Sequence, residues 1–406
     1  MLDTAAAVLA AVPLLDEADV VDFLGLGGLE SIRVMAEYDA AVARFLQGDV
    51  VGAAVGLEHV LTLPGVDYPI WRIYTLSSLA LVRAWTGSCN DAVQLADAAL
   101  LAADSLGLAH HTSTIHAHMV SALVHLDRAE LGPAERSLGE SDLLNRRRPS
   151  TVVNADLQRA LLARFVAVTE GPDGALAHLR TPAASAIEPA VVAEANRALE
   201  ARLLIGTRDL VGARVILKDA DSRPGLAAAR VDLALATGDL PAARRLVETW
   251  SPAEHELRAR VGRHLRHAVV LDLDEDHRAA RAALHEAVAT AENNRLRWPF
   301  LEVPSALRRI RRQPGNHSPL LTAALANLAL VLEPRERAQD GLASPLSQRE
   351  LAVLEYLPGR LRNEDIANEL FVSVNTLKTH LTNIYRKLGV EDREQAISRA
   401  TDLGLL

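Results

Sequence analysis

The sequence predicts an all-α protein, in which an α-solenoid of helix hairpins precedes a small four-helix domain. Ala, Leu, Val and Arg dominate the 406 residues, and only 3% of them are aromatic. This composition favours closely packed helices over a β-sandwich, which needs aromatic and β-branched residues. Two patterns support the prediction: a turn into a helix that recurs along most of the chain, and a dense series of helix-capping signals after Leu346.

The chain begins with an apolar run from Ala5 to Leu15. The run follows an aspartate, has no basic start and leads into acidic residues, which is unlike a secretion signal. We therefore expect residues 1–28 to form an N-terminal helical segment of the fold. Cys89 is the single cysteine, which excludes an internal disulfide, and no apolar run is long enough to span a membrane. A cytoplasmic protein without membrane contact is expected.

A helix-start pattern recurs at intervals of 30 to 42 residues. Each start places an alanine four positions later and, in most copies, a small residue three positions later. The seven starts are Asp49, Ser88, Glu130, Gly171, Asp209, Asp239 and Asp276. Asp or Ser before a helix caps its free amides, and alanine in the first turn lets the preceding helix approach closely.

Apolar-periodic segments, such as Ile70–Ala84, Ile115–Leu126 and Val152–Val168, separate these starts. Each unit is therefore predicted to be a helix hairpin of about 40 residues, a period typical of an α-solenoid. Residues 29–332 resemble degenerate tetratricopeptide-type repeats, like those of the maltose-regulon activator group; an irregular helical domain is the alternative. The concave face of a solenoid can hold an effector or a partner protein, which the sequence does not identify.

Several conspicuous side chains in this region are expected to be structural. Four tryptophans are interpreted as core residues: Trp71, Trp85, Trp250 and Trp298. His111, His118 and His125 would share one face of a helix, but each step of seven residues spans roughly 10.5 Å, too far for one metal ion. With His110 and His116 they are interpreted as structural or solvent-exposed, and no metal site is predicted. Two arginine clusters, at 146–148 and 308–312, are expected to be solvated; the second could assist DNA binding.

The sequence gives no support for an enzyme. Its three lysines are Lys218, Lys378 and Lys387, and none follows a glycine, so a phosphate-binding loop is absent. No Ser/His/Asp or paired-carboxylate arrangement is evident. No cofactor is predicted.

Residues 333–345 are polar, with two prolines and a glycine, and are predicted to be a linker. Residues 346–406 then carry four helix signals. Ser347 and Glu350 form a capping box, and Asn363 caps a second helix. Ser373 caps a third helix, and Asp392 with Gln395 opens a fourth, from Arg393 to about Leu403.

The third helix, Val374 to Leu388, has two different faces. Leu377, Leu381, Ile384 and Leu388 form one apolar stripe. The opposite face carries Asn375, Lys378, Thr379, Thr382 and Arg386, and no acid occurs between Leu370 and Val390. The 61-residue segment has eight Lys/Arg and nine Asp/Glu, and this helix carries three of the cations and none of the acids. Such a helix can enter a major groove lined by phosphates.

The motifs of this segment resemble the LuxR-type helix-turn-helix family along its length: Leu346-Ser-Gln-Arg-Glu, Asn363-Glu-Asp-Ile-Ala, Leu370-Phe-Val-Ser, Thr376-Leu-Lys-Thr-His and Lys387-Leu-Gly-Val. The segment is most similar to the large LuxR regulators with helical repeats, the maltose-activator-like group. Those relatives usually have an ATP-binding domain, and this chain has no phosphate loop, so ATP-gated switching is not expected. The N-terminal helical segment, residues 1–28, is a candidate remnant of such a domain.

The resemblance also implies roles for individual residues. The family's base-reading positions fall on Lys378, Thr379 and Thr382. Its phosphate contacts fall on Thr376, His380, Arg386 and Lys387, with helix packing as the alternative for His380. The resemblance places a dimer contact on the fourth helix, at Gln395, Ile397 and Ser398.

Together these observations predict a DNA-binding transcriptional regulator. The helical-repeat domain senses an effector or partner and controls the C-terminal module, which reads double-stranded DNA as a homodimer. RNA polymerase is a further candidate partner. The alternative is a protein-interaction scaffold whose C-terminal module does not bind DNA.

Overall fold

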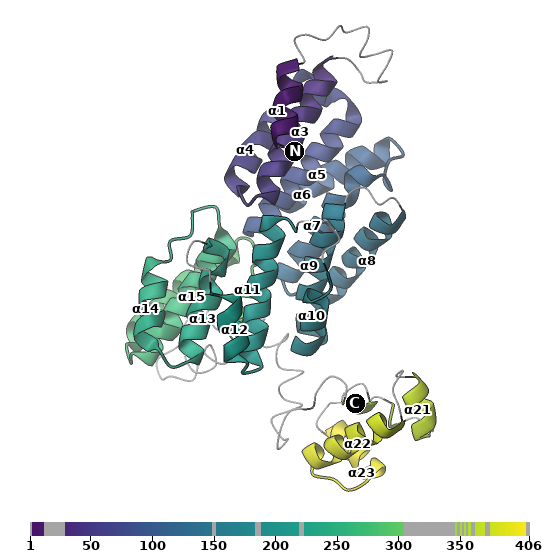
Figure 1. Ribbon diagram of the computed structural model, residues 1–406, viewed down its shortest axis with the longest axis vertical. Helices are drawn as coiled ribbons and strands as arrows, with labels where there is room; N and C mark the ends of the chain where they lie inside the picture. The colour runs from purple at the N-terminus through teal and green to yellow at the C-terminus, as the bar shows by residue number, and fades with distance from the viewer. Residues whose placement is uncertain are drawn as a thin grey trace. The chain divides into compact units, whose positions relative to one another are not determined.

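The computed structural model divides the chain into two compact units, Met1–Asn316 and His317–Leu406, each described by itself (Figure 1). The described residues are 2–11, 29–147, 152–182, 188–218, 223–303, 346, 350, 353–354, 356–358, 362–369 and 374–402. All regular elements in these ranges are helical, which confirms the predicted fold class.

The described residues of the first unit form seven successive helix hairpins (Figure 1). The pairs are α3 (Leu29–Leu46) with α4 (Val50–Val60), α5 (Pro69–Thr86) with α6 (Cys89–Ser105), α7 (Ile115–Asp127) with α8 (Leu131–Arg147), α9 (Val152–Thr169) with α10 (Pro172–Leu179), α11 (Ala190–Gly206) with α12 (Leu210–Ile216), α13 (Ala227–Ala236) with α14 (Leu240–Thr249), and α15 (Leu257–Leu273) with α16 (His277–Glu292). Helix α1 (Leu2–Ala11) packs against α3, and the short α17 (Trp298–Leu301) packs against α15.

All seven predicted starts directly precede the second helix of a hairpin. The four aspartates accept a hydrogen bond from the backbone amide three residues later, at 2.8 to 3.0 Å. The alanine of every copy is completely buried: Ala53, Ala92, Ala134, Ala175, Ala213, Ala243 and Ala280. The repeat seen in the sequence is therefore a capped turn followed by a close helix–helix contact.

A polar ladder joins the first helices of four successive hairpins. The Tyr38 hydroxyl lies 2.8 Å from Ser78 Oγ, which lies 3.0 Å from Nδ1 of His116. The other ring nitrogen of His116 lies 3.0 Å from Asn154 Oδ1. Burial lowers the pKa of His116, so the neutral ring is favoured. This histidine therefore has a structural role.

The remaining histidines of the group do not share one helix face as expected. His111 precedes α7, where its ring accepts a hydrogen bond from the Ser113 amide at 3.2 Å. His118 and His125 do lie on α7, but each is near a carboxylate of α8 or its cap, Glu140 at 3.4 Å and Glu130 at 2.7 Å. Within the described ranges no group of side chains could hold a metal ion.

Asp127, in the third hairpin, connects to the fourth and seventh hairpins through two arginines. This carboxylate, at the end of α7, is completely buried. Arg164 of α9 donates to it at 2.8 Å, and Arg258 of α15 donates through Nε at 3.1 Å and also through Nη2. Arg258 also donates to the carbonyl oxygens of Ala84 and Trp85 at the end of α5. The arginine therefore links helices about 130 and 170 residues apart in the sequence.

Cys89 lies beside this carboxylate and should resist thiol reagents. Its side chain is completely buried, and burial together with Asp127 raises its pKa to about 12. Because the thiolate is the reactive form, we expect the native chain to react with a thiol reagent only as fast as this region opens. Labelling at several reagent concentrations, with and without denaturant, measures this. A rate proportional to reagent concentration in the native state, equal to that of the denatured chain, would contradict it.

Other predictions concern the ends of the elements. Arg146, near the end of α8, is highly exposed and pairs with Asp142 at 2.7 Å, as expected for a solvated helix end. The linker at 333–345 and the arginines at 308–312 lie outside the described residues. No helix in the described ranges is long and apolar enough to cross a membrane.

Candidate functional site

Three helices of the second unit form a core around the predicted apolar stripe. They are α21 (Asn363–Glu369), α22 (Val374–Leu388) and α23 (Arg393–Asp402). All four stripe residues of α22 are buried. They share the core with Leu346, Val353, Leu354, Leu357, Ile366, Ala367, Ala396 and Ala400. The observed bounds of α22 equal the predicted ones.

Local signals fix where these helices begin and end. Asp392 Oδ1 accepts from the Gln395 amide at 2.8 Å, and Gln395 Oε1 accepts in return from the Glu391 amide at 3.2 Å. This confirms the predicted opening of the fourth helix. Gly389 has a φ of +69°, a left-handed conformation that ends α22. The second helix differs from the prediction, because Asn363 is already helical and Asp365 accepts from the Arg362 amide at 3.0 Å.

The face of α22 opposite the stripe presents the predicted DNA-contacting side chains to solvent. Lys378, Thr379 and Thr382 are exposed, as are Thr376 and Arg386, whereas His380 is half-buried. The Thr382 hydroxyl donates to the Lys378 carbonyl at 3.0 Å, so its methyl group is the part left for an outside contact. The helix thus combines a fixed inner face with an outer face that carries cations and no acids. The first helix of the motif lies largely outside the described residues.

Lys387 has a different role from the predicted one. Its ammonium lies 2.7 Å from Glu350 Oε2, and the exposed fractions of the two side chains are 15% and 4%. Glu350 is the last residue of the predicted capping box, so this ion pair ties the end of α22 to the first helix. The pair holds the Lys387 ammonium against the domain, so its phosphate contact stays a prediction, and we leave Lys387 out of the proposed DNA contacts.

This reassignment gives a testable difference between two basic neighbours. Lys387→Met should destabilise the chain by about 3 kcal/mol or more, because it removes the cation that neutralises the buried Glu350 carboxylate. Exposed Arg386→Met should change stability by about 0.5 kcal/mol or less. Denaturant unfolding of both variants, followed by circular dichroism, makes the comparison. Equal midpoints would show that the ion pair contributes no stability.

The predicted dimer residues lie on α23 in three different environments. Gln395 is exposed but engaged in the helix cap. Ile397 packs partly against the core, and Ser398 is exposed. The structure holds one chain, so the dimer contact stays a prediction.

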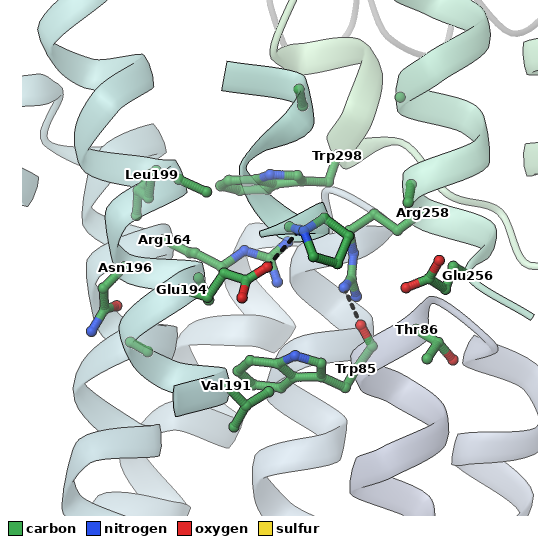
Figure 2. Close-up of a pocket in the computed structure, with 18 of the residues that line it drawn as sticks. Trp85, Thr86, Arg164, Val191, Glu194, Asn196, Leu199, Glu256, Arg258 and Trp298 are labelled. Atoms are coloured by element: carbon green, nitrogen blue, oxygen red, sulfur yellow. Dashed lines mark hydrogen bonds between the residues drawn. The ribbon is translucent and has the colours of Figure 1, made fainter. Parts of the chain in front are cut away.

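The first unit contains a cavity of about 470 Å³, a size typical of small-molecule sites. Figure 2 shows Trp298 above and Trp85 below in this view, with Arg164, Glu194 and Arg258 between them. The first helices of the hairpins supply the walls. Trp85, Leu123, Leu161 and Leu199 line it at steps of 38 residues, one from each of α5, α7, α9 and α11.

The expectation that the tryptophans are core residues is incomplete. Trp298 and Trp250 are buried, yet both line the cavity together with Trp85. Single tryptophans far apart in the sequence gave no hint of this shared surface. A usable signal was the 38-residue recurrence of leucine after Trp85, which marks the same position on successive first helices.

Residues 344–400 match the model of a family described as bacterial regulatory proteins, luxR family. The second unit therefore carries a LuxR-family helix-turn-helix domain, which confirms the resemblance. The transcriptional regulatory protein YxjL of Bacillus subtilis (strain 168) is 35% identical over 105 residues, 26% of this chain and 48% of that protein. The HTH-type transcriptional regulator MalT of Yersinia pestis (strain Pestoides F) is 48% identical over 60 residues, 15% of this chain and 7% of that protein.

MalT of Yersinia pseudotuberculosis (serotype O:1b, strain IP 31758) has the same identity and coverage. The chain therefore spans less than half the length of the curated relatives it matches. The similarity to MalT, over 60 residues, has about the length of the C-terminal domain.

Proposed function

We propose that the protein is a DNA-binding transcriptional regulator. The C-terminal domain reads the major groove, and the helical-repeat unit senses an effector or partner that controls it. The domain match and the regulator relatives support the DNA-binding half of this proposal. The sensing half is supported by the cavity in the repeat unit.

The observation that carries the proposal is the two-sided helix α22. Its stripe is fixed in the domain core, while Lys378, Thr379 and Thr382 are exposed on the outer face. Lysine can donate to guanine O6 or N7, and the threonine methyls can contact thymine. Thr376, His380 and Arg386 would contact phosphates, which position the helix without reading sequence.

Dimerisation would place two such helices on one operator. Two chains related by a two-fold axis bind half-sites about one helical turn apart, so the operator would be roughly palindromic. We propose α23 as the dimer contact through Ile397 and Ser398. RNA polymerase remains a candidate partner of the bound dimer, and the protein would act in the cytoplasm, where its DNA lies.

The test is a gel shift with the full-length chain on DNA from the region upstream of its own coding sequence. We expect binding whose affinity falls steeply as salt rises, because neutralised phosphates release counterions. A folded chain that binds no DNA at low salt would instead support the scaffold alternative. Calorimetry with ATP should show no heat of binding if the chain contains no nucleotide site.

A further inference from the structure

The charged side chains around the cavity differ in how many of their hydrogen-bonding atoms already have a partner in the protein. Arg258 donates through all three of its nitrogens, and so does Arg266, to Asp232, Glu302 and the Gly262 carbonyl. Glu256 accepts from the Ala253 amide at 2.8 Å. Each of these groups is engaged in contacts that hold the walls together, and the two arginines have no nitrogen without a partner.

Two other arginines have donors left over. Arg164 lies 4.4 Å above the Trp298 ring and donates to Asp127 only through Nη2. Its Nε and Nη1 have no hydrogen-bond partner in the described parts of the chain, and neither is a fully enclosed polar atom. Arg202 pairs with Glu302 at 3.1 Å, and its side chain is 21% exposed. Both residues line the cavity and can donate to an anionic group.

Acceptors are left over on the same wall. Glu194 accepts from the Gly225 amide through Oε1, and Asn196 donates through Nδ2 to Glu188 at 2.9 Å. Within the described ranges, Oε2 of Glu194 and Oδ1 of Asn196 have no further partner, and neither is fully enclosed. Both residues line the cavity (Figure 2).

Helix α11 therefore presents an acid and a cation in order along the cavity. Glu194 and Arg202 are eight residues apart, which is about 12 Å along a helix axis. Three extended residues of peptide span about 10 Å. The spacing of opposite charges thus matches the two ends of a tripeptide.

We propose that this cavity binds a short peptide of about three residues with free termini and apolar side chains. Its ammonium would pair with Glu194 and its carboxylate with Arg164 and Arg202. The side chains would pack on Trp85, on Leu199 and on the part of Trp298 that Arg164 leaves uncovered. The inference deepens the sensing half of the proposed function.

The test is titration calorimetry of the full-length chain with every tripeptide built from Ala, Val, Leu and Phe. We expect at least one tripeptide to bind. N-acetylation or C-amidation of that peptide should lower its affinity by about tenfold or more. These capped peptides test the charge pairing without altering the protein. Failure of the whole panel to bind, or equal affinity of capped and free peptides, would overturn the proposal.

Two variants assign the charges to residues. Glu194→Gln should weaken binding of the free peptide by about tenfold and leave binding of the N-acetylated peptide unchanged. Arg202→Gln should likewise weaken binding of the free peptide by about tenfold and leave binding of the C-amidated peptide unchanged. Glu135→Gln, an equal charge change at an exposed site on α8, is the control and should have no effect. Equal losses for free and capped peptides would contradict the assignment.

Two further measurements separate this inference from others. A neutral oligosaccharide could pack on the same tryptophans, and binding of such a sugar in the cavity, with no peptide binding there, would also overturn the inference. Peptide binding is measured without DNA, and the gel shift is measured without peptide. The peptide proposal can therefore be disproved while the DNA-binding proposal holds, and the DNA-binding proposal can be disproved while the peptide proposal holds.

Discussion

Asp127→Asn should destabilise the repeat unit by about 3–5 kcal/mol, because it removes a completely buried charge that pairs with two partly buried arginines. Asn also turns an amide donor toward guanidinium groups that need an acceptor. The unfolding midpoint in urea, followed by circular dichroism and tryptophan fluorescence, measures the loss. Asp104→Asn, the same change at an exposed position on α6, is the control and should shift stability by about 0.5 kcal/mol or less.

The pH dependence gives an independent check on the same carboxylate. Burial alone would raise the pKa of Asp127, but Arg258 and Arg164 outweigh it and hold the pKa below the usual value. A lowered pKa means that the stabilisation is fully present above the unfolded-state value of about 3.9 and is lost as pH falls through the folded value. The difference in free energy of unfolding between wild type and Asp127→Asn should therefore be constant near neutral pH and become smaller in acid. A gap that grows with acidity would contradict the role of the charge.

Local signals explain why much of the fold could be predicted. The capping aspartates and the alanine in each first turn act within one helix turn of the features they determine, so their effect is visible in the sequence. The stripe from Leu377 to Leu388 likewise fixes which face of α22 is buried, whatever the partner helices are. These features need no knowledge of which distant residues meet.

Contacts between distant residues could not be predicted in the same way. Asp127 is the last residue of a helix, a position where acids are usually exposed. No neighbouring residue in the sequence indicates that Arg258 will contact it. The cavity depends on the accumulated rotation from hairpin to hairpin, which repeat spacing alone does not specify. Lys387 belongs to a motif that predicts phosphate contact, yet its pairing with Glu350 depends on how the first helix packs. For Asp127 and Lys387 the deciding interaction is a long-range pairing of charges, and for the cavity it is the relative orientation of distant hairpins.

Lys378→Ala should reduce affinity for the preferred DNA site by about 1–3 kcal/mol and relax base preference at one position of each half-site. The lysine is exposed on the acid-free face of α22, where its ammonium can reach a base edge. The preferred site is first obtained by selection from random DNA with the full-length chain. Fluorescence anisotropy on that site and on its single-base variants then measures both effects.

Arg386→Ala is the matched comparison, because it removes one exposed cation from the same helix two turns later. A phosphate contact carries no sequence information, so this variant should weaken all sites alike and reduce the salt slope by about one unit. Lys378→Ala should reduce discrimination between sites, which a change in charge alone cannot do. If both variants weakened every site equally, Lys378 would be a phosphate contact, and base reading would rest on Thr379 and Thr382.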